Sequence, residues 1–412
     1  MLWTEPIGEF KLSTVSTSPN SLAPSSAWLR LSIAGGATLL IGMGLGRFSY
    51  TPLIPALIEA GHLSAWQAGA IGASNFTGYL AGALVAPAMR MRWGEATTMR
   101  LSLITGLVAL FACVLPWGFE WLMFWRALLG AVVGVMMIYC LAIATRTAPP
   151  GKLGAATGIV YTGVGIGILL SGSLVPWLLQ YGIAAAWTGI GLVGVVAFVV
   201  ALWGWRSLDA SNRGNTAANS PHPKIRWNLT MTGLIATRVL FSIGLIPHTI
   251  YWVDYLVRGL GRDIEFGGMH WVLFGLGAIG GTYLWGRLAD RIGFRSGLAL
   301  AFAAVASGIA LPFMNSAGWA LVMSSLVVGA QPGLTAIMSG RFHQLMGPDG
   351  MAPVWRMSAL ISTILQAVAA YGYVTAFDLT GSYTPIFLAG SVSMALGTII
   401  ALALRSPNES AK

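Results

Sequence analysis

Long apolar runs recur along the whole chain, and they constrain its fold more than any other feature. Twelve of them approach the roughly 20 residues that an α-helix needs to cross a bilayer. They cover residues 31–58, 66–89, 98–116, 121–145, 153–179, 183–205, 229–257, 267–286, 297–314, 317–340, 354–377 and 383–404. Only 9% of the 412 residues are charged, against about 25% in a soluble domain. The sequence therefore predicts an all-α membrane protein with twelve transmembrane helices.

The Lys and Arg residues test this count independently. With the N-terminus inside, eighteen of the 23 fall on the cytoplasmic side, and only Arg258 and Arg262 fall outside. Cytoplasmic loops of membrane proteins carry such an excess of basic residues. The pattern predicts a multi-pass protein of the cytoplasmic (inner) membrane with both termini cytoplasmic. It also explains the net charge of +10 without nucleic-acid binding.

The longest polar interruption, residues 207–227, lacks apolar periodicity and predicts a cytoplasmic linker. It divides the chain into an N-terminal six-helix bundle (28–206) and a C-terminal six-helix bundle (228–405). Residues 1–27 are rich in Ser, Thr and Pro without a signal-peptide core, and they predict a disordered cytoplasmic tail. Residues 406–412 predict a second cytoplasmic tail.

Many glycines are spaced four residues apart within the predicted spans. Such spacing lets helix backbones approach closely in lipid, whether for packing alone or for helices that slide. Examples are Gly42/Gly46, Gly130/Gly134, Gly163/Gly167 and Gly277/Gly281.

The chain lacks the sequence patterns of common membrane enzymes and metal sites. It contains no HExxH, no GxSxG and no Cys/His cluster, and its two cysteines, Cys113 and Cys140, lie in apolar runs. We therefore expect no catalytic site, no cofactor and no metal site. A sensor built on a similar fold is a further alternative, although the chain has no room for an appended signalling domain.

The segment from Gly286 to Arg295 between the eighth and ninth spans reads GRLADRIGFR. It resembles the signature loop of the major facilitator superfamily, which implies a transporter of two rocking bundles. The resemblance assigns a cytoplasmic latch to Gly286, Asp290, Arg291, Gly293 and Arg295. The matching loop after the second span begins at Gly82, and Ala86 replaces the aspartate there. We expect a weak or differently built latch in the N-terminal half.

A narrower resemblance lies in the first span, where Gly44 to Pro55 looks like the opening of the YbfB/YjiJ branch of this superfamily. It continues in the seventh span from Ile246 to Tyr255. Members of that branch are implicated in copper and in riboflavin uptake, so the resemblance does not fix a substrate. The copper type relies on paired ligands, and here His270 is followed by Phe274 where a second, sulfur ligand would sit.

Arg47, Arg126 and Arg238 lie inside the predicted spans, where an ionisable residue is costly and is a functional candidate. No carboxylate lies deep in the N-terminal half. We therefore predict that Arg47 and Arg126 bind the carboxylate or a similar anion of a small solute. The alternative is that each arginine bonds backbone carbonyls or an acid at an outer helix end. The sequence leaves open whether Arg238 is structural or functional.

Other polar and aromatic residues within the spans are candidate neutral contacts to the substrate. They are Tyr50, Asn75, Tyr79, Tyr161, Trp252, Gln331 and Gln366. Three titratable residues, His248, Asp254 and His270, are candidates for proton coupling. The alternative for each histidine is a hydrogen-bonded packing role.

Together these features predict a monomeric secondary active transporter in the lipid bilayer. It would move a small organic solute, such as a carboxylate anion, by alternating access, as a proton symporter. Export of drug-like compounds and uptake of riboflavin or copper are the alternatives. The scarcity of acidic residues deep in the spans argues against a cation exporter. It also leaves anion exchange and facilitated diffusion as alternatives to symport.

Overall fold

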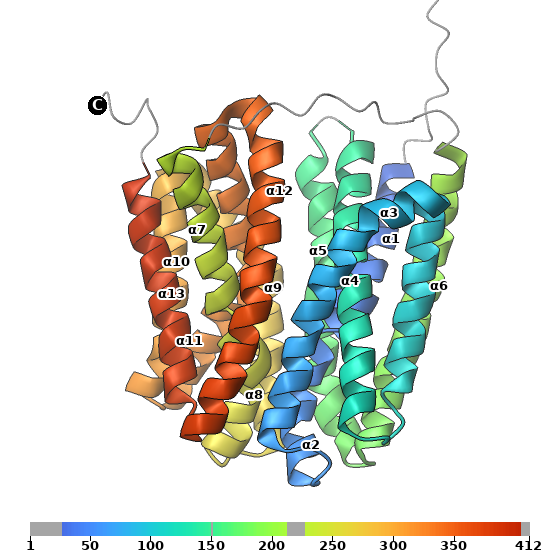
Figure 1. The fold of residues 1–412 in the computed structure, drawn as a ribbon, viewed down its shortest axis with the longest axis vertical. Helices are drawn as coiled ribbons and strands as arrows, with labels where there is room; N and C mark the ends of the chain where they lie inside the picture. Colours follow the sequence, from blue (N-terminus) through green and yellow to red (C-terminus); the bar gives the residue numbers. More distant parts are fainter. Residues whose placement is uncertain (1–26, 150, 212–226, 405–412) are drawn as a thin grey trace, which may run out of the picture.

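The computed structural model describes residues 27–149, 151–211 and 227–404. These residues form helices and contain no strand. The helices run along one common direction in two bundles that stand side by side (Figure 1). The all-α prediction is confirmed. The predicted tails, apart from a terminal residue, and most of the predicted linker lie outside the described residues, although the last helix before the linker continues to Ser211.

The first bundle begins with a span that changes helix type several times. Its elements are α1 (Ala27–Leu39), η1 (Leu40–Leu45), η2 (Phe48–Leu53), α2 (Ile54–Glu59), α3 (Ala65–Ala112), α4 (Phe119–Thr147), α5 (Leu153–Leu179) and α6 (Ile183–Ser211).

The second bundle repeats this pattern with another irregular first span. Its elements are α7 (Leu229–Gly244), η3 (Pro247–Tyr251), α8 (Trp252–Asp254), η4 (Tyr255–Gly259), α9 (Ile264–Ile292), α10 (Phe294–Met314), α11 (Gly318–Gly329), α12 (Pro332–Thr380) and α13 (Thr384–Ala403).

Two helices, α3 and α12, contain a glycine with a non-helical backbone. Gly94 has φ 75° and Gly347 has φ 68°, a region that residues with a Cβ rarely adopt. Within the described ranges, nine helices are long and apolar enough to cross a membrane, or ten if α11 and the first part of α12 form one bent span. This number takes α3 as one helix, although its backbone breaks at Gly94. The count of twelve therefore stays a prediction.

Side-chain caps explain where several helices begin. The Ser64 hydroxyl accepts a hydrogen bond from the Gln67 backbone N–H, and the Gln67 side chain accepts one from the Ser64 N–H. Asn228 and Asp263 cap α7 and α9 through single side-chain bonds. Such caps satisfy backbone donors that a helix N-terminus leaves unpaired.

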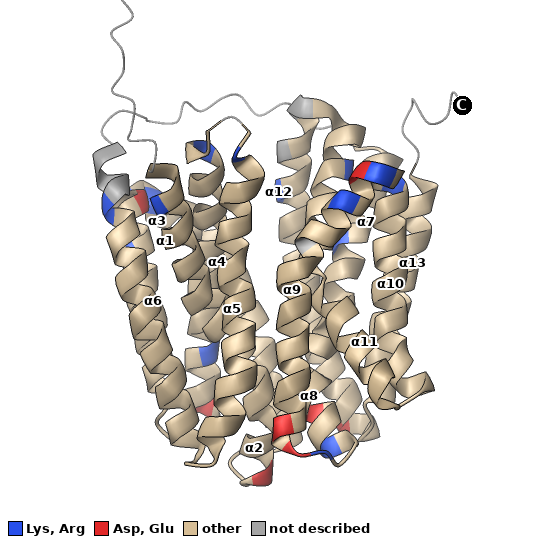
Figure 2. Cartoon of the chain, turned by 180° about the vertical axis from the view of Figure 1, so that it is seen from behind, with Lys and Arg blue, Asp and Glu red and all other residues tan. Residues whose placement is uncertain are grey.

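Basic and acidic residues separate to opposite ends of the molecule. Lys and Arg gather at the end where the C-terminal trace leaves the bundle, and most Asp and Glu lie at the end near α2 and α8 (Figure 2). We call these the basic end and the acidic end.

The predicted glycine pairs lie where helices cross closely. A Cβ at Gly130 or Gly134 in α4 would collide with the backbone of α3, at Asn75 and Tyr79. Gly277 of α9 meets α11 at Leu326 in the same way. These glycines serve tight helix packing.

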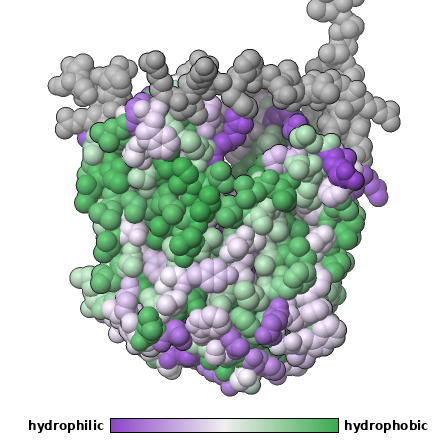
Figure 3. Space-filling model, viewed as in Figure 1, coloured by the Kyte–Doolittle hydropathy of each residue, from purple (hydrophilic) through white to green (hydrophobic). Residues whose placement is uncertain are grey.

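The two bundles touch toward the acidic end and separate toward the basic end. Gly165 and Gly172 of α5 pack directly against α9, whereas a Cβ at Gly158 of α5 or Gly286 of α9 would meet nothing within 4 Å. The molecular surface is hollowed between the bundles near the basic end (Figure 3). The structure thus has one closed and one open end.

Candidate functional site between the two bundles

The first span breaks at Gly46 and Arg47. It passes from α1 through a π-helical segment, η1, into the 3-10 segment η2. Pro52 lies within η2, and proline removes a backbone donor and crowds the preceding turn. The Gly44 backbone also packs against Gly167 of α5, where a Cβ would lie 2.8 Å from the Gly167 Cα. The sequence Gly44 to Pro55 thus produces a broken helix.

Arg126 of α4 stabilises this break. Its Nη1 donates to the Gly46 carbonyl, and its Nη2 donates to the Arg47 carbonyl at 3.0 Å. The Tyr50 ring lies under the guanidinium at 4.7 Å, and the Tyr50 hydroxyl donates to the Ala68 carbonyl. The Asn75 amide donates to the Arg126 carbonyl at 2.9 Å. Three predicted substrate contacts, Arg126, Tyr50 and Asn75, are therefore bonded to the protein itself.

Arg47 is placed differently, because its guanidinium lies against aromatic rings and makes little use of its N–H donors. It lies 4.0 Å from the ring centre of Phe76 and 5.8 Å from that of Tyr79, both on α3. Its one hydrogen bond among the described residues goes from Nη1 to the weak acceptor Met43 Sδ, at 3.8 Å. Aromatic faces hold a cation without consuming its N–H donors.

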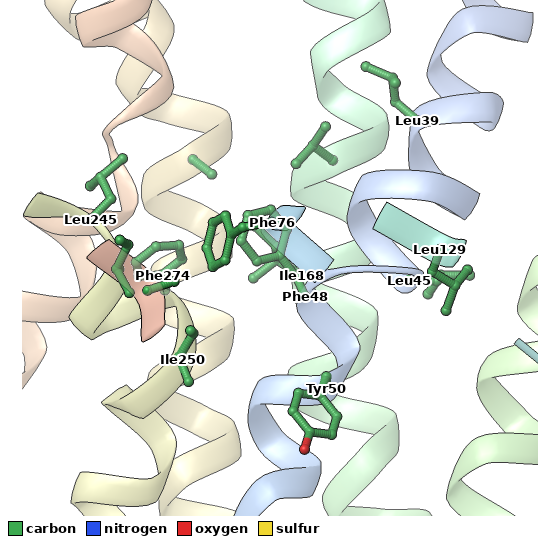
Figure 4. Packing of buried hydrophobic residues seen from close by; sticks show 14 of the residues in the cluster. Leu39, Leu45, Phe48, Tyr50, Phe76, Leu129, Ile168, Leu245, Ile250 and Phe274 are labelled. Atoms are coloured by element: carbon green, nitrogen blue, oxygen red, sulfur yellow. The ribbon is translucent and has the colours of Figure 1, made fainter. Parts of the chain in front are cut away.

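Apolar side chains beside Arg47 join the two bundles. Figure 4 draws Phe48 and Phe76 on the side of the first bundle toward Phe274 of α9. The Phe48 ring is 6.1 Å from that of Trp271, which stacks on Phe274 at 4.8 Å. Trp271 also donates to the Ser171 hydroxyl of α5. Arg47 therefore sits at the boundary where contact between the bundles begins.

The second bundle places another arginine in this region. The Arg238 guanidinium of α7 lies 4.0 Å from the ring centre of Trp355 on α12. It is within electrostatic range of the phenol groups of Tyr79 and Tyr161, which belong to the first bundle. The arrangement brings Arg47, Tyr79 and Tyr161 together with Arg238 and Trp355. Phe76, Arg238 and Trp355 were not predicted as contacts; Phe76 had a sequence signal, since it lies three residues from Tyr79 on one helix face.

The charge of this region is positive. Among the described residues, no carboxylate lies within ion-pair distance of Arg47, Arg126 or Arg238; ion pairs join Arg146 to Glu95 and Arg258 to Asp254. Charged groups in a membrane interior are normally paired. The site can therefore stabilise an anion.

The predicted proton-coupling residues form hydrogen-bonded pairs in the closed part of the second bundle. His248 Nε2 lies 2.9 Å from the Ser324 hydroxyl, and His270 Nδ1 lies 2.9 Å from that of Ser325. The indole N–H of Trp252 also donates to Ser325. Trp252, a predicted substrate contact, is fully buried in this cluster.

Asp254 lies nearer the acidic end. It pairs with Arg258 at 3.2 Å, and its carboxylate accepts a hydrogen bond of 2.7 Å from the Tyr383 hydroxyl.

The two predicted glutamine contacts lie in the second bundle. Gln331 is half-buried at the bend of 41° between α11 and α12, and the Gln366 amide donates to the Ser242 carbonyl of α7. Two surface pockets of about 690 and 710 Å³ lie at the acidic end, and none of the predicted substrate contacts lines them. We therefore place the site between the bundles.

The predicted latch lies at the basic end, in the turn from α9 to α10. Asp290 and Arg291 are exposed near the end of α9, four and five residues after Gly286. Gly293 forms the turn with φ 84°. Arg295 donates through Nε to the Leu402 carbonyl near the end of α13, at 3.1 Å.

The matching turn in the first bundle is at Gly94, which has the same kind of backbone as Gly293. These turns are 199 residues apart (293 − 94 = 199), whereas the sequence comparison assumed a separation of 204. The turn geometry therefore makes Met91, instead of Ala86, the residue of the first bundle that is equivalent to Asp290. A carboxylate is supplied by Glu95, which pairs with Arg146 of α4 at 2.8 Å, and the Ala86 carbonyl accepts from the Tyr139 hydroxyl.

Among the described residues, no three His, Cys, Asp or Glu side chains come together where they could hold a metal ion. Cys113 and Cys140 are buried and free.

The chain is similar to known membrane transporters. Residues 39–402 match the family described as "Uncharacterised MFS-type transporter YbfB". The chain is 25% identical to the 3-(3-hydroxy-phenyl)propionate transporter of Escherichia coli K12, over 93% of each chain. It is 29% identical to an uncharacterised MFS-type transporter of Yersinia pestis, over 58% of this chain and 62% of the relative. It is 26% identical to a putative metabolite transport protein of Haemophilus influenzae, over 62% and 64%.

Proposed function

Because the chain belongs to the family of YbfB-type major facilitator transporters, we propose that it carries a small organic anion across the membrane by alternating access. The observation that carries the proposal is Arg47, a cation at the boundary between the bundles. It is held by aromatic rings and has no carboxylate partner among the described residues. A ligand carboxylate would supply the missing acceptors bidentately.

Arg126 takes a positioning role in this proposal. Its donors occupy the carbonyls of Gly46 and Arg47, so it holds the break from which Arg47 projects. The relative named as a 3-(3-hydroxy-phenyl)propionate transporter supports an organic acid as cargo. The basic end is assigned to the cytoplasm on the excess of Lys and Arg there (Figure 2). The state described here would then be open to the cytoplasm, in a bacterial inner membrane.

The test is counterflow of labelled 3-phenylpropionate, benzoate and succinate into proteoliposomes. We expect uptake of at least one acid and a loss of at least about tenfold in Arg47→Gln, since a hydrogen bond to a charged group is worth about 1.5–3 kcal/mol. Arg30→Gln is the matched control, because Arg30 also lies over an aromatic ring, the indole of Trp203, but is exposed. Normal uptake by folded Arg47→Gln would refute the role of Arg47.

Proton coupling is assigned to the second bundle, where His248, Asp254 and His270 are buried. Asp254 is the foremost candidate because its pairing with Arg258 can be exchanged for a proton. Acid uptake into liposomes that contain a pH dye should then move protons with the acid. Asp254→Asn should abolish the proton movement and retain counterflow. Uptake without any proton movement in the unmodified protein would contradict symport.

A further inference from the structure

Arg238 is a charged group that the protein holds in position without satisfying it. Its guanidinium is fixed against Trp355, and its Nη1 is buried with no hydrogen-bond partner in the part of the chain that the structure describes. A buried donor without an acceptor costs free energy. If Arg238 served only to join α7 to α12, an uncharged side chain packed against Trp355 would do the same without a buried, unpaired donor.

The surroundings of Arg238 include residues of the opposite bundle. The phenol groups of Tyr79 and Tyr161 lie within its electrostatic range. Tyr79 also lies beside Arg47, 5.8 Å from ring centre to guanidinium carbon. Tyr79 is therefore close to Arg47 and within electrostatic range of Arg238, so one residue of α3 connects arginines of the two bundles.

The two arginines lie at different depths. Arg47 is 20 residues from the start of α1 (47 − 27 = 20) and Arg238 is nine from the start of α7 (238 − 229 = 9), and both helices start at the basic end (Figure 1). At 1.5 Å per residue, this difference of 11 residues (20 − 9 = 11) corresponds to about 16 Å in depth between their Cα atoms. Long arginine side chains shorten that gap, so a ligand on the order of 10 Å long can reach both.

We propose that Arg238 is the second anion contact of this site, and that the substrate is an elongated organic acid with an acceptor group at each end and a planar body between them. This inference rests on the proposed function. The carboxylate at one end would bind Arg47, and the second group, a carboxylate or a hydroxyl, would bind Arg238. The rings of Phe76, Tyr79 and Trp355 suit an apolar, planar body.

Such a ligand would also join the two bundles. One end contacts the first bundle and the other end contacts the second, so binding favours the arrangement in which they approach each other at the open end. An acid with one acceptor group would bind Arg47 but would not draw the second bundle toward it. The length of the substrate is therefore linked to closure of the cavity.

The test measures equilibrium binding to the purified full chain in detergent. The probes are 3-phenylpropionate, with one acceptor end, and 3-(3-hydroxyphenyl)propionate and 3-(4-carboxyphenyl)propionate, with two. We expect the dicarboxylate to bind at least about tenfold more tightly than the one-ended acid. Arg238→Gln should remove that advantage and change the one-ended affinity less than about twofold, whereas Arg47→Gln should weaken binding of all three at least about tenfold. Arg30→Gln is the control.

The outcomes separate this inference from the proposed function. If Arg47→Gln weakens binding of every acid but Arg238→Gln weakens all acids equally or none, the inference is wrong and the proposed function stands. If no acid binds the unmodified protein, both are wrong. If Arg238→Gln does not fold, the unmodified protein still decides: equal affinity for the one-ended acid and the dicarboxylate would overturn the inference. Arg238→Lys, which keeps the charge but lacks the planar fork, should retain part of the preference.

Discussion

The first spans of the two bundles are both broken, but the breaks are stabilised in different ways. The break in residues 27–59 is held by a charged side chain of α4, Arg126, which bonds the backbone there. A second charge, Arg47, lies at the break against the ring of Phe76. In residues 229–259, the irregular segment instead carries His248 and Trp252, whose side chains bond neutral serines of α11. One break presents a cation, and the other is closed by a neutral network.

This difference separates two tasks within one architecture. Irregular backbone inside a membrane needs partners from neighbouring helices. Where those partners are charged and the acids are missing, the region attracts an anion. Where they are neutral serines, as for His248 and Trp252, the region packs tightly and closes one end of the path, while His248 Nδ1 has no hydrogen-bond partner among the described residues. In the proposed function, the first bundle is therefore the principal binder and the second the closing element, and Arg238 would add a contact at the open side.

The largest expected effect follows from breaking the support of the first span. Arg126→Gln removes the donors to two buried carbonyls, and each unsatisfied group costs about 1–3 kcal/mol. We expect a loss of roughly 2–6 kcal/mol of stability, seen as a clear fall in the thermal unfolding midpoint in detergent. Arg47→Gln should leave the midpoint nearly unchanged, which makes it the matched comparison. A stable Arg126→Gln protein with an unaltered midpoint would show that the break supports itself.

A second prediction concerns the closed end. A Cβ at Gly69 of α3 would lie 2.8 Å from the Tyr251 hydroxyl and 3.0 Å from Val374 of α12. Gly69→Val should therefore force the bundles apart at the acidic end. The readout is alkylation of a cysteine introduced at Thr249, whose carbonyl accepts a hydrogen bond from Thr51 across the bundles. We expect labelling to rise several-fold over the background of the buried native cysteines.

Gly372→Val is the control for that experiment. Gly372 lies on α12 two residues before Val374, the residue that Gly69 approaches, but a Cβ at Gly372 would meet nothing within 4 Å. Equal labelling of Thr249→Cys in the Gly69→Val and Gly372→Val backgrounds would mean that Gly69 does not hold the closed end together.

The smallest expected effects test the neutral network. Ser325 bonds both His270 and Trp252, whereas Ser324 bonds His248 alone among the described residues. Each neutral hydrogen bond contributes about 0.5–1.5 kcal/mol. Ser325→Ala should therefore lower the unfolding midpoint more than Ser324→Ala, and neither should change acid affinity. A larger loss from Ser324→Ala, or an altered affinity in either variant, would contradict a purely closing role.

Hydropathy and spacing predicted the all-helical fold, because lipid demands long apolar helices and the glycine pairs mark their crossings. The sequence also singled out Arg47 as an arginine inside a span, and its role as an anion contact stays a prediction. Its open alternative for Arg126, bonding to backbone carbonyls, matches the contacts of that side chain. The turn at Gly94 was harder to predict, since only its backbone geometry reveals that it corresponds to Gly293.

Contacts between distant segments could not be predicted from one sequence. Trp355 is 117 residues from Arg238 (355 − 238 = 117), and no local pattern connects them. The serines that bond the histidines are likewise on another helix, and serine in an apolar run gives no sign of its partner. Tertiary packing decides which buried polar groups are satisfied and which are left for a ligand.

The most direct measurement of the central claim compares a carboxylate with its uncharged counterpart. Binding of 3-phenylpropionate and of 3-phenylpropionamide is measured on the unmodified protein and on Arg47→Gln. We predict that the unmodified protein prefers the acid by at least about tenfold and that Arg47→Gln has no such preference, because the charge of the ligand would meet Arg47 alone at that end. If the preference for the acid persists in folded Arg47→Gln, the anion does not bind at Arg47.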